Sequence, residues 1–155
     1  MKNWALPFAF AVLLQQLWSS GNDAKAAEDL RMRPGISFDQ DIDSGFPITA
    51  SKMDDVSLAA DRINFIFMAA SGDLNSARQS KRVVDLYKRY GKDVKFIILD
   101  VDRPVNDDAA KLIKKYYKGY IPLTIILTAS GAVDLNHTGE MEERLLRHHL
   151  DALAN

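Results

Sequence analysis

Two long apolar runs, at residues 63–70 and 94–101, dominate the pattern of the chain, and a shorter run covers residues 124–128. Strands that are covered on both faces of a sheet show such continuous runs, whereas strands with one wet face alternate apolar and polar residues. We therefore predict that these segments form the centre of a sheet. The turn Ala129-Ser130-Gly131 predicts a hairpin that returns through residues 132–135.

Three other segments repeat apolar or small residues at steps of three and four, which is the period of a helix with one buried face. Helices that alternate with strands, followed by a terminal hairpin, predict an α/β fold with a mixed sheet and helices on both faces. The helical positions are Ala77, Ser80, Val83, Val84, Tyr87 and Tyr90, then Ala109, Leu112, Ile113, Tyr116 and Tyr117, and finally Met141, Leu145, Leu146, Leu150 and Leu153.

The part of the chain before residue 63 has a weaker pattern. Residues 27–50 are rich in Asp, Arg, Gly and Pro, and we interpret them as an extension in front of a domain at residues 51–155. Residues 36–38 and 47–49 are two candidates for a first edge strand. Ser51 stands three residues before an acid, as in a capping box. It predicts a short helix with Met53, Val56, Ala59 and Ala60 near one face.

The order of motifs along the core resembles the thioredoxin family. The first long strand runs into the polar turn Ser71-Gly72-Asp73, and the second ends near Asp102. An Ile121-Pro122 pair precedes the hairpin, and a glycine bend follows it at Gly139. The resemblance implies a thioredoxin-like three-layer α/β/α sandwich with a mixed central sheet. It also implies that Ile121-Pro122 is similar to the family's cis-proline loop.

The redox machinery of that family is missing from this sequence. Thioredoxins use a Cys-x-x-Cys motif, and this chain has no cysteine. The resemblance places Asp73 and Ser76 at the two vacated redox positions. It places Gly72 where the family has a tryptophan, Phe67 in place of a buried acid, and Lys81 in place of a helix-kinking proline. Because disulfide exchange requires a thiolate nucleophile, we expect no disulfide oxidoreductase activity.

The leading hypothesis for function is a redox-inactive module that binds an extended protein or peptide segment, in a chaperone-like or assembly role. Pairing of a peptide with the backbone before the cis-proline needs no thiol. The alternative that Pro122 only shapes its loop stays open. The predicted peptide-binding groove consists of Ser71, Gly72, Asp73, Tyr120, Ile121, Pro122, Thr138 and Gly139.

Two alternative functions remain open. The helix N-terminus at residues 73–76 has free N–H groups and a positive field, which suit a small anion such as glutathione, or a thiol-independent enzyme. Asp73 is also a common type of N-cap, and such a cap would compete with an anion for the same N–H groups. The second alternative is a structural subunit whose interface contains Tyr87, Tyr90, Tyr116 and Tyr117.

The first residues have the layout of a secretory signal peptide, with a positive start, an apolar run at residues 4–14 and a polar stretch that contains Ala-x-Ala. We predict a signal peptide at residues 1–26, with cleavage after Gly21 as the alternative. The apolar run is shorter than the roughly 20 residues of a membrane span, so we expect no stable span after cleavage. The protein would be exported, to the periplasm of a Gram-negative bacterium or otherwise as a secreted protein.

Charge and ligand patterns favour neither nucleic acid nor a metal. The 20 basic and 21 acidic residues give a formal net charge of -1, which provides no strong field for a polyanion. Residues 39–50 alternate acids as a calcium loop does, but the glycine falls one place late and Ala50 replaces the final Glu. His148 and His149 are adjacent on a helix and point in different directions. We expect no metal and no cofactor.

Overall fold

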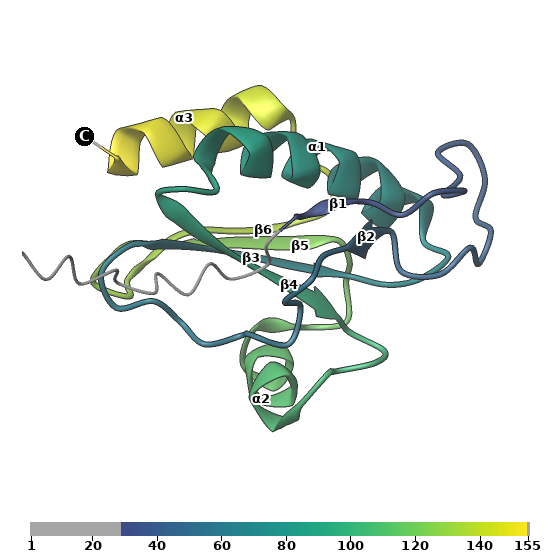
Figure 1. Ribbon diagram of the computed structural model, residues 1–155, viewed down its shortest axis with the longest axis horizontal. Helices are drawn as coiled ribbons and strands as arrows, with labels where there is room; N and C mark the ends of the chain where they lie inside the picture. The colour runs from purple at the N-terminus through teal and green to yellow at the C-terminus, as the bar shows by residue number, and fades with distance from the viewer. Residues whose placement is uncertain (1–28, 155) are drawn as a thin grey trace, which may run out of the picture.

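The computed structural model describes residues 29–154, so the predicted signal peptide lies outside the described residues. Helices α1 and α3 cover one face of a four-stranded sheet, and α2 covers the other (Figure 1). Within residues 29–154, no helix is long and apolar enough to cross a bilayer. The helices are α1 (Leu74–Tyr90), α2 (Asp107–Tyr116) and α3 (Glu143–Leu153), and the strands of this sheet are β3 (Ile63–Ala69), β4 (Val94–Asp100), β5 (Leu123–Leu127) and β6 (Val133–Thr138).

The strand order of the sheet is β4-β3-β5-β6. β3 and β4 are parallel, whereas β5 is antiparallel to β3 and β6 is antiparallel to β5. This mixed sheet between two helical layers confirms the fold class predicted from the sequence. Met68 near the end of β3 lies opposite Leu123 at the start of β5. The turn that follows β3 and the loop that precedes β5 therefore leave the sheet at the same end.

Alternate residues of the central strands supply two separate cores. Phe65 and Phe67 pack under α1 and α3 together with Phe96, whose ring is stacked on Phe65 at 4.9 Å between centroids. Ile66 and Met68 pack toward α2. All seven residues of β3 are buried, as the nearly continuous apolar run predicted.

The N-terminal extension adds a small sheet of its own. β1 (Arg31–Met32) and β2 (Ile48–Thr49) pair antiparallel, and Ile48 is fully buried in the core under α1 and α3. Of the two candidate edge strands, residues 47–49 contain a strand and residues 36–38 do not. The strand at Ile48–Thr49 pairs with β1 and does not extend the four-stranded sheet.

The prediction of a short helix that begins at Ser51 is wrong. Residues 51–54 form a turn, and the chain then runs to β3 without helical structure. Met53 packs on the core under α1 and α3, whereas Val56 packs on the α2 core. No helix face can reach both cores, because the segment passes around the outer edge of β4 from one side of the sheet to the other (Figure 1).

Two polar side chains of the sheet hold this segment extended. Asn64 accepts a hydrogen bond from the Ala59 N–H and donates one to the Ala59 C=O, both at 2.8 Å. The buried Lys95 ammonium lies 3.1 Å from the Asp55 carboxylate and 2.8 Å from the Ser57 hydroxyl. Partial burial alone would raise the pKa of Asp55, but the hydrogen bonds from Ser57 and Lys95 outweigh it and leave this pKa lowered.

Candidate functional site

The vacated redox positions lie where β3 turns into α1. Asp73 is the N-cap of α1: its carboxylate accepts a hydrogen bond from the Ser76 N–H at 2.6 Å, and its C=O accepts one from the Ala77 N–H at 3.0 Å. The capping role that the sequence offered for Asp73 is confirmed. An anion at this helix end would have to compete with the Asp73 carboxylate.

Ser76 lies inside the protein and not on the surface. Its side chain is fully buried, and its hydroxyl accepts a hydrogen bond from the Ala70 N–H at 3.3 Å. The structure therefore gives Ser76 a role in tying the end of β3 to the first turn of α1. A substrate at the surface does not reach this hydroxyl in the described conformation, which removes the support for an enzyme based on Ser76.

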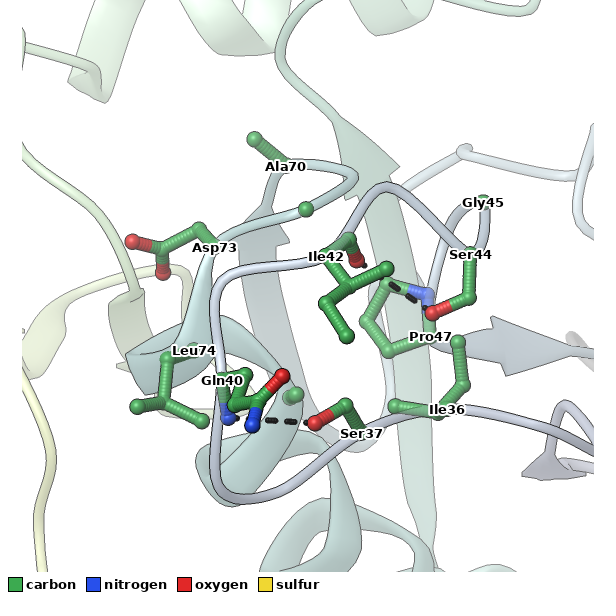
Figure 2. A pocket seen from close by; sticks show the side chains of 12 residues that line it. Ile36, Ser37, Gln40, Ile42, Ser44, Gly45, Pro47, Ala70, Asp73 and Leu74 are labelled. Carbon is green, nitrogen blue, oxygen red and sulfur yellow. Dashed lines mark hydrogen bonds between the residues drawn. The ribbon is translucent and has the colours of Figure 1, made fainter.

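A loop of the N-terminal extension covers the start of α1. We call residues 36–45 the strap (Figure 2). The Asp41 carboxylate accepts a hydrogen bond from the Leu74 N–H at 2.8 Å. Arg78 on α1 donates from Nε to the Phe38 C=O at 3.1 Å, and the Lys81 ammonium lies 5.9 Å from the centre of the Phe38 ring. The helix N-terminus thus carries two carboxylates from its own chain.

The strap passes close to the backbone of Gly72. Gly72 has a φ of +76°, which favours glycine, and a Cβ at this position would make an ordinary contact of 3.4 Å with Asp43 Cα. Figure 2 shows Ile42 turned toward Pro47 and the Asp73 carboxylate turned away from the strap. The space between strap and helix has a volume of about 10 Å³, no more than one water needs. The strap therefore leaves little space between itself and the start of α1.

The other half of the predicted groove remains open. The Ile121-Pro122 peptide bond is cis, and the Gly139 N–H donates to the Pro122 C=O at 2.7 Å. Thr138 pairs with Leu123, so Tyr120 to Pro122 and Thr138 to Gly139 come together as predicted. Within the described chain, the backbone of Ile121 has no hydrogen-bond partner. Tyr120 is 71% exposed, more than any other large hydrophobic residue described.

The acidic loop and the histidines have roles other than metal binding. Asp43 accepts a hydrogen bond from the Gly45 N–H at 3.1 Å, and Asp41 binds α1. His149 Nδ1 lies 2.7 Å from the Asp134 carboxylate, and His137 Nε2 lies 3.3 Å from the Glu140 C=O. Among residues 29–154, no three His, Asp or Glu side chains gather in a way that could hold a metal ion.

The four tyrosines proposed for an interface do not share a surface. Tyr87 and Tyr90 pack with the core under α1 and α3, and the Tyr90 hydroxyl donates to Asp151 at 2.6 Å. Tyr116 and Tyr117 pack against the α2 core. Because these two cores lie on opposite faces of the sheet, one partner surface cannot cover all four rings.

Sequence reasoning missed the strap. Asp39, Asp41 and Asp43 alternate along it, and in the sequence this alternation resembles a calcium loop. The positive N-terminal end of α1, which has no thiolate, is the feature to which such acids could be matched. Both features are visible in the sequence, but they are more than thirty residues apart, so local patterns do not predict their contact.

Comparison with solved structures agrees with this architecture. A structure described as a malarial protein matches with a TM-score of 0.51 and 17% sequence identity, covering 61% of this chain and 99% of the other. Thioredoxin-2, described as a component of the malaria parasite protein secretion machinery, matches with a TM-score of 0.51 and 18% identity, covering 59% of this chain and 82% of its own. No protein-family model and no curated protein sequence matches this chain. The chain therefore has a thioredoxin-like fold without cysteine.

Proposed function

We propose that this protein is an exported, redox-inactive thioredoxin-like module that binds an extended protein segment at the loop formed by residues 120–122. The observation that carries the proposal is the exposed Tyr120 beside the backbone of Ile121, which has no hydrogen-bond partner among residues 29–154. An extended segment can pair with that backbone without a thiol. An exposed aromatic ring supplies a large contact area at low cost in side-chain entropy.

The state of the α1 N-terminus favours protein binding over the small-anion alternative. The Leu74 N–H binds Asp41, and the Ser76 N–H binds Asp73. Glutathione or phosphate would have to displace a carboxylate that is already tethered nearby, and a tethered group competes at high effective concentration. The Ile121 backbone has no such competitor among the described residues.

Export is proposed from residues 1–26 and rests on their sequence pattern alone. Expression in a host that processes signal peptides, followed by N-terminal sequencing of the mature protein, tests it. We expect a new N-terminus at Ala27. A product that keeps Met1 and stays inside the cell contradicts export.

Selection from a displayed library of random twelve-residue peptides tests the proposed binding directly. Bound peptides should shift the amide resonances of Tyr120, Ile121 and Gly139. Ile121→Asp should weaken binding at least about tenfold, or about 1.4 kcal/mol, because it places a charge beside the paired peptide. The matched control is Val133→Asp, since Val133 is 53% exposed and lies at the far end of β6 from Thr138.

Two results would count against the proposal. One is equal weakening by Ile121→Asp and Val133→Asp, which would indicate a general effect of the added charge. The other is a peptide that shifts the amides of Leu74 to Ala77 and leaves those of Tyr120 and Ile121 unchanged. That result would return the helix N-terminus to consideration as the binding site.

A further inference from the structure

A second depression begins at Tyr120 and extends away from the strap. It has a volume of about 360 Å³ and lies between the end of α2 and the sheet. The ring of Tyr120, which is 71% exposed, contributes the main apolar surface, and the ring of Tyr116 borders it. Leu123 forms the buried floor. Asn136 and Thr138 come from β6, the last strand of the sheet, and both are exposed. We call this depression the basic groove, because its remaining lining residues are Lys115 and Lys118.

The charge of the basic groove has one sign. Lys115 and Lys118 line it, and none of the lining residues in the described part of the chain is acidic. The Lys115 ammonium lies 4.8 Å from the centre of the Tyr116 ring, so its stem lies along an aromatic surface while its charge stays accessible to solvent. Lys115 lies in the last turn of α2, where the negative end of the helix dipole stabilises a cation. Lys118 follows the C-cap Tyr117 and lies beyond the last turn of α2, so a helix-capping role does not account for it.

We propose that the basic groove binds the acidic part of an extended protein segment, the same segment whose backbone pairs with Ile121. This inference rests on the proposed function and adds the chemistry of its partner. Tyr120 belongs to both the groove and the loop before Pro122, so one chain can follow both. Carboxylates of the segment face Lys115 and Lys118, and an apolar side chain between them packs on the exposed ring of Tyr120.

A peptide fits the basic groove better than a nucleic acid does. Binding of single strands normally requires a positive track that follows several successive phosphates. The groove offers two lysines, which is too few for such a track but enough to pair with the carboxylates of a short acidic stretch.

Three synthetic ten-residue peptides test the inference. In each peptide every second residue is apolar, alternately Val and Phe, and the residues between them are all Glu in the first peptide, all Gln in the second and all Lys in the third. We expect the Glu peptide to bind about tenfold more tightly than the Gln peptide at low salt, with the difference shrinking as salt is added. The double variant Lys115→Glu/Lys118→Glu should remove this preference. The matched control, Lys111→Glu/Lys114→Glu, makes the same charge change on α2 outside the groove lining and should keep it.

The outcomes separate the partner chemistry from the proposed function. Equal binding of the Glu and Gln peptides that still weakens with Ile121→Asp overturns the acidic preference and leaves the protein-binding function in place. Absence of binding by all three peptides overturns both. A single-stranded oligothymidylate of twelve nucleotides that displaces the Glu peptide at equal concentration also overturns the inference, because it assigns the groove to nucleic acid.

Discussion

Placing a tryptophan at position 72, where the resemblance to thioredoxins puts one, tests whether the strap and that side chain exclude each other. The Gly72 backbone has a φ of +76°, and even a Cβ there lies 3.4 Å from Asp43 Cα. The space between the strap and α1 has a volume of only about 10 Å³. An indole does not fit between them, so we expect Gly72→Trp to push the strap away from α1.

The expected cost divides into two parts. Any residue other than glycine at this φ costs about 1–2 kcal/mol. Gly72→Ala measures that part alone, because a methyl group at 3.4 Å makes an ordinary van der Waals contact. Gly72→Trp also breaks the hydrogen bond from Leu74 to Asp41, which contributes about 0.5–1.5 kcal/mol. We expect a total loss of about 1.5–3.5 kcal/mol for the tryptophan variant.

Urea unfolding gives the loss of stability, and chymotrypsin cleavage after Phe38 reports the position of the strap. The control is Gly131→Ala, because Gly131 has a φ of +83° and a Cβ there meets no atom within 4 Å. Both alanine variants should lose similar stability and keep their resistance to cleavage. If Gly72→Trp leaves Phe38 as resistant as in the wild type and the Leu74 amide unshifted, the proposed exclusion is refuted.

Three further predictions concern the cap and the buried polar pairs. Asp73→Ala should lower the free energy of unfolding by about 1 kcal/mol, measured by urea unfolding, because α1 loses its N-cap. Asp55→Asn should cost about 1–3 kcal/mol at pH 7, less than for a fully buried pair because Asp55 is 29% exposed beside Lys95. The lowered pKa of Asp55 means that its stabilisation is present above about pH 4 and is lost as the pH falls through the folded-state pKa, so the deficit of the variant should shrink toward pH 2. Burial, followed by the hydrogen bond to Asp151, raises the pKa of Tyr90, so the wild type should lose stability as the pH rises above about 10, and Tyr90→Phe should lack this loss in a series of urea unfolding curves.

The central sheet could be predicted from the sequence because its signals are local. The apolar run of β3 is broken only by Asn64, and the structure buries every residue of that strand. The helix periods also depend on neighbouring residues, and α1 begins directly after the predicted cap Asp73. The residues of each of these elements specify its secondary structure, and tertiary contacts only bring the elements together.

The segment before β3 could not be predicted in the same way, because distant residues decide its conformation. Met53 and Val56 are spaced like one face of a helix, yet they pack into two different cores. Asn64 holds the backbone of Ala59, and Lys95 holds Asp55 forty residues away. Local periodicity does not include these partners, which is why the helix prediction failed.

The strap gives a physical reason why the loss of cysteine and the loss of tryptophan at position 72 belong together. A thiolate at a helix N-terminus is stabilised by the positive field of the free N–H groups. In this chain, Asp41 and Asp73 already occupy that field, and a third negative charge would be repelled by both. The strap also takes the space beside Gly72 that a tryptophan would need. Once the N-terminal extension docks on α1, a reactive thiolate at this helix end is disfavoured, because the field that would stabilise it is already occupied by two carboxylates.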